Sequence, residues 1–345
     1  MLYVTTRVDQ DAFTAFRALT ENRGPEGGFF VPMQFPYFDE HEILKLAHRS
    51  FSQNIAEILN LFFGTQLDAW TIEFGIGRYP VKLDGLNTKI TVAKAWHNPV
   101  YRFDRMVSGI EKVLRQSDQI CKIPTDWMML ACRIAVLFAI HGELLRRGYL
   151  SITQKIDIAV PSKDLSPLMA VWYAKSMGLP IETIVCCCNE NNSLWNLLHK
   201  GEFRTDSLAC STHTQDCDYT VPTDLERLIF ATLGRDETAR FCEICRVGGL
   251  YLLDSEQLDQ LRNGIYVSVV SGKRMASSIP NLYKTTGHIA DPYTALAYCG
   301  LTDYRAVTGA NKQGLIISEE SPLFSLQFIA RCMNVSAEEL KLKLD

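Results

Sequence analysis

From residue 126 onward, short apolar segments alternate with segments that begin and end with helix-capping residues. Strands are expected at residues 156–160, 183–188, 265–270 and 314–318, each separated from the next by one or more helices. This alternation is typical of a mainly parallel, twisted sheet with helices on both faces. The sequence therefore predicts an α/β fold and leaves the order of the strands open.

The first part of the chain alternates less regularly and carries more glycine and proline turns. A strand is expected at residues 2–4 and a helix at 11–19, where apolar residues fall on one helical face. A second helix is expected between a capping Ser52 and a terminating Gly64. A further strand is expected at residues 89–96.

Two later helices are predicted from their ends and their polarity. The segment 126–147 is apolar over Met128 to Ile140 except for Arg133, which is too short a run for a membrane span and favours a buried core helix. Residues Thr223 to Glu226 fit a capping box, in which both side chains satisfy N–H groups at the start of a helix.

The net charge and the targeting signals of the chain indicate which kinds of partner and location to expect. The chain has 345 residues, of which 35 are Lys or Arg and 39 are Asp or Glu, giving a formal net charge of −4. This balance argues against a nucleic-acid partner, because such proteins carry a basic face. We expect no membrane association and no signal peptide, and therefore a cytoplasmic location.

The eleven cysteines do not follow a disulfide or zinc pattern. Their number is odd, and Cys186 to Cys188 fall in an expected strand, where small apolar side chains fill a core. Cys242 and Cys245 have metal-like spacing, but no second pair accompanies them, and they fall inside an expected helix. We therefore predict no metal site.

Three loops that follow expected strands are the natural places for a ligand, because open α/β sheets bind ligands at the carboxyl ends of their strands. These loops are residues 96–105, 161–167 and 271–274. The second loop leads into a helix N-terminus, where free N–H groups favour an anion. It contains no glycine, however, so an N-cap formed by Ser162, Asp164 or Ser166 is the simpler interpretation.

The same segments resemble the threonine synthase family. Residues 160–166 (VPSKDLS) resemble its VPSGNFG, residues 173–181 (YAKSMGLPI) its AKxMGLPI, and residues 291–298 (DPYTALAY) its DPHTAVAY. Residues 24–32 (GPEGGFFVP) and 223–230 (TDLERLIF) resemble two further motifs, in the family's order. The resemblance implies a fold-type-II pyridoxal phosphate (PLP) enzyme fold. It divides the chain into a threonine-synthase-like N-terminal domain, residues 1–88, and an α/β domain, residues 89–345.

The chain departs from the family at the parts that hold the cofactor. In the stretch that resembles FHGPTLAFKDF, Asp104 stands at the position of the Schiff-base lysine and Arg105 at the next acid. Lys163 to Ser166 replace the phosphate-binding GNFG. No SGDTG-like segment is present, so an internal deletion near residues 115–126 is expected to remove the small cofactor-covering domain. The segment Ser318 to Phe324 replaces the motif that contacts the ring nitrogen.

These departures predict a pseudoenzyme that does not bind PLP and has no catalytic residues of the family type. A small-molecule ligand, a second copy of the chain or a different protein is compatible as its partner. If the covering domain is absent, the face beneath it should carry polar replacements or form a contact. The residues of this degenerate site are predicted to be His97, Asn98, Asp104, Arg105, Ser162, Lys163, Asp164 and Ser166.

Two alternatives stay open. In the first, the chain is a threonine-synthase-like enzyme with relocated chemistry, using Lys94 or Lys163 as the nucleophile, or Asp104 and His97 as an acid/base pair. For Lys94, the simpler interpretation is a solvent-facing lysine on a strand. In the second, the chain is a structural subunit that pairs with an intact relative.

Overall fold

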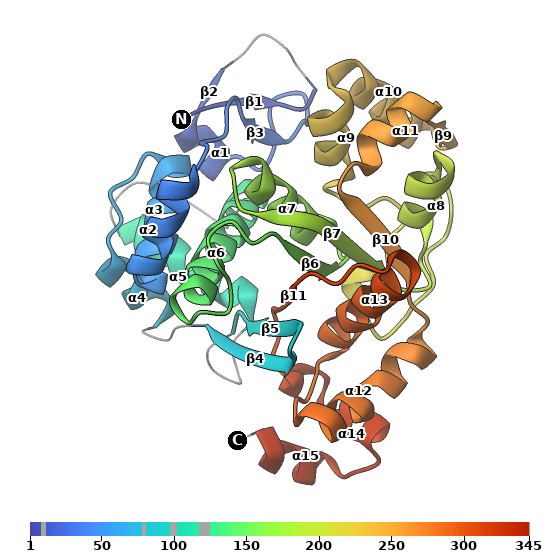
Figure 1. Ribbon diagram of the computed structural model, residues 1–345. Coiled ribbons are helices and arrows are strands. Elements are labelled where there is room, and N and C mark those ends of the chain that lie inside the picture. Colours follow the sequence, from blue (N-terminus) through green and yellow to red (C-terminus); the bar gives the residue numbers. More distant parts are fainter. Residues whose placement is uncertain (8–11, 78–80, 97–101, 117–124, 345) are drawn as a thin grey trace.

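The computed structural model describes residues 1–7, 12–77, 81–96, 102–116 and 125–344. Its centre is a six-stranded sheet with the strand order β10-β7-β6-β11-β5-β4 (Figure 1). All neighbouring strands are parallel except β4, which runs antiparallel to β5 at one edge. The prediction of a mainly parallel sheet is confirmed. The six strands are β4 (Lys82–Asn87), β5 (Ile90–Lys94), β6 (Ile156–Pro161), β7 (Ile181–Cys188), β10 (Ile265–Val269) and β11 (Gly314–Ser318).

Helices cover both faces of this sheet, as predicted. Successive side chains of a strand point to opposite faces. Ile158 and Val160 of β6 accordingly pack into one hydrophobic cluster with α6 (Asp126–Arg146) and α7 (Ser166–Ser176). Ala159, which lies between them, packs into a second cluster with α12 (Gly272–Thr286) and α13 (Pro292–Thr308).

The long helix α6 lies in the interior, against α7 and the N-terminal helices α2 (Glu40–His48) and α3 (Phe51–Phe63). Among the described helices, only α6 is long and apolar enough to cross a membrane, and 83% of its most apolar window is buried inside the protein. The prediction of a buried core helix is confirmed.

The N-terminal segment forms a separate small antiparallel sheet, in the order β2-β1-β3. Its elements are β1 (Leu2–Thr5), β2 (Phe13–Thr14), α1 (Ala15–Thr20) and β3 (Phe30–Pro32). The helix expected at 11–19 is therefore wrong in its first part. Phe13 pairs with Tyr3 of β1 as a strand residue, and Thr14 caps the helix that follows by accepting from the Arg17 N–H.

Two predicted helix caps also differ from the structure. The cap of α3 is Ser50 rather than Ser52, and Ser50 forms a reciprocal capping box with Gln53. At α9 (Leu225–Leu233) the predicted capping box is wrong, because Asp224 is the N-cap and makes no side-chain cap bond. The Glu226 carboxylate instead accepts from Arg7, at 2.8 and 3.0 Å, which ties α9 to the N-terminal strand.

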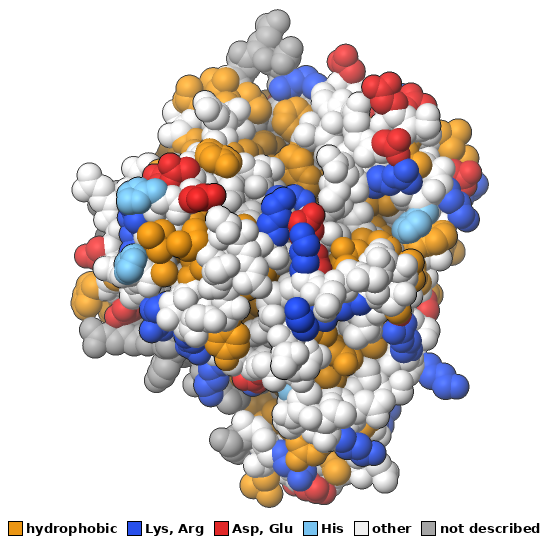
Figure 2. Space-filling model, in the orientation of Figure 1, with side chains coloured by type: hydrophobic (Ala, Val, Ile, Leu, Met, Phe, Trp, Pro, Cys, Tyr) orange, Lys and Arg blue, Asp and Glu red, His pale blue; other side chains and the backbone are white. Residues whose placement is uncertain are grey.

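The cysteines of the described ranges form no disulfide. The Cys242 and Cys245 thiols lie on a helix, as expected, and all cysteines within the described ranges are free. On the face shown in Figure 2, the described Lys and Arg side chains are interspersed with Asp and Glu. The remaining elements are α4 (Ala69–Ile76), α5 (Phe103–Gln116), α8 (Ser193–Lys200), β8 (Glu202–Arg204), the 3₁₀ turn η1 (Gln215–Cys217), α10 (Arg235–Val247), β9 (Leu250–Leu252), α11 (Ser255–Arg262), the 3₁₀ turn η2 (Pro322–Ser325), α14 (Leu326–Met333) and α15 (Ala337–Leu344).

Candidate functional site

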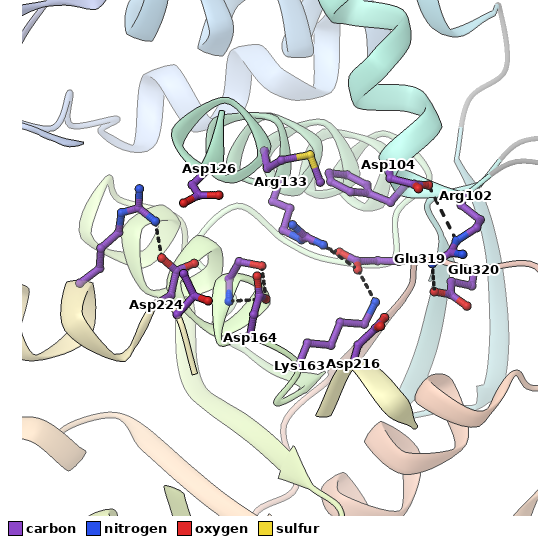
Figure 3. A pocket seen from close by; sticks show the side chains of 15 residues that line it. Arg102, Asp104, Asp126, Arg133, Lys163, Asp164, Asp216, Asp224, Glu319 and Glu320 are labelled. Carbon is purple, nitrogen blue, oxygen red and sulfur yellow. Dashed lines mark hydrogen bonds and ion pairs between the residues drawn. The ribbon is translucent and has the colours of Figure 1, made fainter. Parts of the chain in front are cut away.

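A cavity of about 480 Å³ lies where the neighbouring parallel strands β6, β11 and β5 end (Figure 3). Open α/β sheets place their ligands at this edge. The residues that line the cavity come from the loops that follow these strands, from the helices that begin there and from the 3₁₀ turn η1. They are Arg102, Phe103, Asp104, Asp126, Met129, Arg133, Lys163, Asp164, Ser166, Asp216, Thr223, Asp224, Arg227, Glu319 and Glu320.

The centre of the cavity is held by one carboxylate shared between two cations. Glu319 accepts from Arg133 through two bonds of 2.9 and 3.1 Å and from the Lys163 ammonium at 2.9 Å. These three side chains are about one-tenth exposed. Burial alone would raise the pKa of Glu319, but Arg133 and Lys163 hold it well below its ordinary value. Burial opposes the charge on Lys163, and Glu319 outweighs that effect, so the pKa of Lys163 is raised.

Four helices, α5, α6, α7 and α9, begin at the cavity, and each carries an aspartate at its start. These residues are Asp104, Asp126, Asp164 and Asp224. A helix N-terminus carries a partial positive charge that favours an anion. The N-cap of α7 is Leu165, which makes no side-chain cap bond, so the interpretation of Ser162, Asp164 or Ser166 as the N-cap is wrong. Asp164 instead accepts from the backbone N–H of Ser166 at 3.1 Å and from its hydroxyl at 2.6 Å, just ahead of that helix.

The loop between β6 and α7 has an unusual backbone. Lys163 and Leu165 adopt positive φ angles of 38° and 68°, a left-handed conformation that favours glycine. The loop is held in place by the Leu165 N–H, which donates to the Ser162 carbonyl at 2.7 Å, and by the Lys163 N–H, which donates to Cys217 Sγ at 3.3 Å. Non-glycine residues in such conformations concentrate at functional sites.

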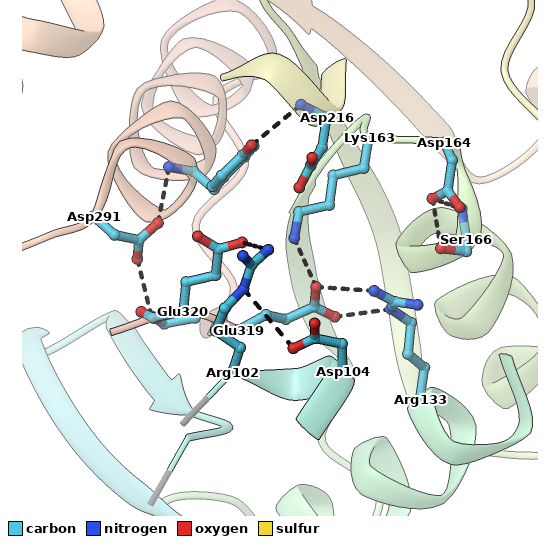
Figure 4. Close-up of polar contacts among 12 residues, drawn as sticks. Arg102, Asp104, Arg133, Lys163, Asp164, Ser166, Asp216, Asp291, Glu319 and Glu320 are labelled. Carbon is cyan, nitrogen blue, oxygen red and sulfur yellow. Dashed lines mark hydrogen bonds and ion pairs between the residues drawn. The ribbon is translucent and has the colours of Figure 1, made fainter. Parts of the chain in front are cut away.

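One end of the cavity is built from the loops after β5 and β11 (Figure 4). Arg102 donates to the Glu320 carboxylate at 3.0 Å. Burial raises the pKa of Glu320, and nearby Asp291 and Asp216 add to the effect, although Lys163 and Arg102 oppose it. The uncharged form of Glu320 is therefore favoured more than that of an exposed glutamate.

The opposite end holds an ion pair between Arg227 and Asp224, whose side chains are 1% and 3% exposed. Burial raises the pKa of Asp224 to about 6, and the charge on Asp164 adds to the effect while Arg227 opposes it. The Arg227 guanidinium also stacks 4.3 Å from the centre of the Phe29 ring. Its Nη2 atom is buried and has no hydrogen-bond partner within the described part of the chain.

The structure brings together four of the eight predicted site residues. Asp104, Lys163, Asp164 and Ser166 line the cavity. Arg105 does not line it and is exposed, and Ser162 is fully buried outside the lining. The other two, His97 and Asn98, lie outside the described residues.

Lys94, the other candidate nucleophile, does not line the cavity. Its ammonium lies 2.6 Å from Asp84 on the edge strand β4, and its side chain is 20% exposed. The interpretation as a solvent-facing strand lysine is therefore only partly right, because the side chain is paired and mostly covered.

Several site residues were not predicted from the sequence. Arg133 and Glu319 lie 186 residues apart, so no local pattern joins them. Two signals were present nonetheless. Arg133 is the only Lys, Arg, Asp or Glu among residues 127–142, and two glutamates, Glu319 and Glu320, directly follow a buried strand.

Comparisons with known proteins agree with the resemblance seen in the sequence. Residues 2–76 match a family model described as the threonine synthase N terminus. Over 176 residues the chain is 24% identical to threonine synthase-like 1 of Homo sapiens, a match that covers 50% of this chain and 24% of that protein. It is 28% identical over 160 residues to threonine synthase of Eremothecium gossypii, covering 42% of this chain and 31% of that one.

These sequence matches span less than a third of the relatives' own length, whereas the fold matches along nearly the whole chain. The PLP-bound threonine synthase of Brucella melitensis superposes with a TM-score of 0.83 at 16% identity, covering 97% of this chain and 92% of that chain. Yeast threonine synthase gives a TM-score of 0.83 at 17% identity, over 98% and 91%. The chain is therefore a threonine-synthase-like protein with the α/β fold of these fold-type-II enzymes.

Proposed function

We propose that this protein is a threonine-synthase-like pseudoenzyme, which binds a small ligand in the cavity and does not carry out PLP chemistry. The observation that carries the proposal is the state of Lys163, the one lysine that lines the cavity in the described part of the chain. Its ammonium is buried against Glu319 at 2.9 Å and its pKa is raised. An amine must lose its proton before it can form an imine with an aldehyde, so this lysine is held in the unreactive form.

The fit of the cofactor's phosphate gives independent support. The helix start at which a phosphate would bind already holds the Asp164 carboxylate, which accepts from the N–H and the hydroxyl of Ser166. A phosphate dianion at this helix start would lie beside that carboxylate, and like charges repel. Asp104 stands where the resemblance places the reactive lysine. The residues present do not fit PLP.

The relocated-chemistry alternative has less support. Lys94 is held by Asp84 away from the cavity, and Lys163 is held by Glu319. The pair of Asp104 with His97 stays a prediction, because His97 lies outside the described residues. The absence of the small covering domain and the pairing with an intact relative also stay predictions.

The test is to mix the purified full-length chain with PLP, reduce with borohydride and map any pyridoxyl-lysine by mass spectrometry. We expect no stoichiometric label and no conversion of O-phosphohomoserine to threonine, with an active threonine synthase as the positive control. A Lys163→Met variant distinguishes labelling in the cavity from labelling of surface lysines. A stoichiometric label that this variant abolishes, or threonine formation, would overturn the proposal.

A further inference from the structure

The turn between α11 and the edge strand β10 contains the one Asn-Gly pair of the sequence, Asn263 followed by Gly264 (Figure 1). Asn263 has φ and ψ angles of −58° and 115°, and Gly264 has a φ of 72°. These angles match a type II turn, whose second central residue needs a positive φ and is therefore usually glycine. The turn thus places an asparagine beside the residue whose backbone N–H is the least hindered, because glycine has no β-carbon.

The peptide group that joins Asn263 to Gly264 is not held by the fold. In the described part of the chain, neither its carbonyl nor its N–H makes a hydrogen bond, and the exposed Asn263 side chain makes none. The Gly264 carbonyl, in contrast, accepts from the Ile184 N–H at 2.9 Å, which anchors the turn to β7. The peptide between Asn263 and Gly264 can therefore turn over, from the type II to the type I arrangement, without breaking a hydrogen bond, and glycine tolerates both.

We propose that Asn263 is a modification site at which the side-chain amide is lost by spontaneous deamidation. As the peptide turns over, the Gly264 nitrogen passes the carbonyl carbon of the Asn263 side chain and attacks it. The new C–N bond closes a succinimide ring, and the amide nitrogen leaves as ammonia with the proton from Gly264. Water then opens the ring at either carbonyl carbon. One opening gives aspartate, and the other gives isoaspartate, in which the main chain runs through the former side chain.

The one Asp-Gly pair of the sequence, Asp84 followed by Gly85, shows how the fold prevents the same reaction. An aspartate closes the ring with loss of water, and it does so in its protonated form, because a carboxylate is a poor electrophile. Asp84 lies within β4, where its carboxylate is bonded by His288 at 2.9 Å and by Lys94 at 2.6 Å. These bonds hold the pKa of Asp84 well below its ordinary value, so it stays ionised. The fold therefore closes this site and leaves the turn at Asn263 open.

The two products differ in their expected effect on the fold. The turn packs against an ammonium group, because a β-carbon placed on Gly264 would lie 2.6 Å from Lys175 Nζ. Burial lowers the pKa of Lys175, so a new carboxylate beside it would favour its charged form and fit the fold. Isoaspartate also lengthens the main chain just before β10, where Ile265 pairs with Ile184. We therefore expect the isoaspartyl product to loosen this edge strand and the aspartyl product to leave it intact.

The test is to keep the purified full-length protein at neutral and at mildly alkaline pH for several weeks and to follow its peptides by mass spectrometry. The peptide that contains Asn263 should gain the mass difference between an amide and an acid and should separate into two products of equal mass. Exposed Asn311, which is followed by Lys312, is the internal control and should react several-fold more slowly. Digestion in water enriched in heavy oxygen marks any deamidation that occurs during sample preparation. Equal rates at the two asparagines, or no product at Asn263, would overturn the proposal.

Two variants separate the effect of the turn from that of the Asn-Gly pair itself. Asn263→Gln keeps an amide at the same exposed position but disfavours the five-membered ring, so it should remove both products. Asp84→Asn introduces a second Asn-Gly pair within β4, and this pair should react several-fold more slowly than Asn263 of the same chain. Chemical denaturation should abolish the difference, because the unfolded chain exposes both pairs equally. Equal rates in the folded protein would show that the pair alone controls the reaction and would contradict the role of the turn.

Discussion

The interior of the sheet is stabilised by apolar packing, whereas its carboxyl edge holds buried charges that must be paired. In the interior, Ile158 and Val160 of β6 pack on one face and Ala159 on the other, and apolar contact alone is sufficient. At the edge, the same strand leads to Lys163, which is buried beside Glu319 and a second cation. The difference indicates that the fold is specified by residues that take no part in the charged site, so that the site can change its chemistry while the fold persists.

The largest expected effect comes from removing the shared carboxylate. Glu319→Leu leaves Arg133 and Lys163 buried without a counter-charge, and breaking such a network costs about 3–5 kcal/mol. Chemical denaturation followed by circular dichroism measures the loss. A triple variant, Arg133→Met, Lys163→Met and Glu319→Leu, should recover most of it, because apolar side chains of similar size then replace all three charges.

The matched substitution in the interior is Ile158→Ala. It should cost a similar 2–5 kcal/mol by leaving a cavity, because Ile158 is 2% exposed. No polar partner exists whose removal would restore this loss. If the triple variant were no more stable than Glu319→Leu, the loss at the edge would be as irreparable as the loss in the interior, and the two regions would not differ in how they are stabilised.

The pH dependence of stability tests the buried aspartate at the other end of the cavity, Asp224. The pKa of Asp224 is raised from 3.8 to about 6, so between about pH 4 and 6 the folded state binds more protons than the unfolded state. Stability contributed by this group is therefore present below pH 4 and is lost as the pH rises through 6, by about 2–3 kcal/mol. Asp224→Asn should flatten this part of the curve of unfolding free energy against pH.

The matched control for the pH experiment is Asp236→Asn, an exposed aspartate on α10. Its curve should run parallel to that of the unchanged protein between pH 4 and 6. Glu319 acts with the opposite sign, because its pKa is lowered, so its contribution is present above its unfolded value and lost in more acidic solution. A curve for Asp224→Asn as steep as that of the unchanged protein would show that Asp224 does not titrate in this range.

Two substitutions at helix starts, one in the scaffold and one at the site, are expected to cause smaller losses of stability. Ser50→Ala removes the capping box of α3 and should cost about 1 kcal/mol. Asp164→Ala removes the carboxylate that accepts two bonds from Ser166 just ahead of α7, and it should cost a similar amount. Chemical denaturation of both variants measures the two losses, and no loss for Asp164→Ala would mean that these two bonds do not hold the start of α7.

The sequence predicted the interior better than the edge, for physical reasons. The parallel strands are continuous apolar runs, which are recognisable locally, whereas the edge strand β4, with the sequence KLDGLN, has no such run. The capping box at residues 223–226 failed because a distant partner, Arg7, binds Glu226 instead. The shared carboxylate could not be predicted from spacing, since Arg133 and Glu319 are joined only by the fold. The family resemblance located Asp104, Lys163, Asp164 and Ser166 because it supplied that long-range information.

The smallest effect is expected where an ion pair of the same type lies in solvent. At the amino-terminal edge of the sheet, Lys312 pairs with Glu182, and the two side chains are 46% and 37% exposed. Water and salt screen such a pair, so Lys312→Met should change the unfolding free energy by less than about 0.5 kcal/mol. Lys163→Met, at the buried edge, should cost several times more, because it leaves Glu319 with one cation in place of two.

Urea denaturation of both variants at low and high salt tests the comparison. If burial sets the strength of the pair, the difference between the two variants will persist at high salt. Its disappearance would mean that the cavity is as well solvated as the surface, and would contradict the buried charge network on which the proposed site depends.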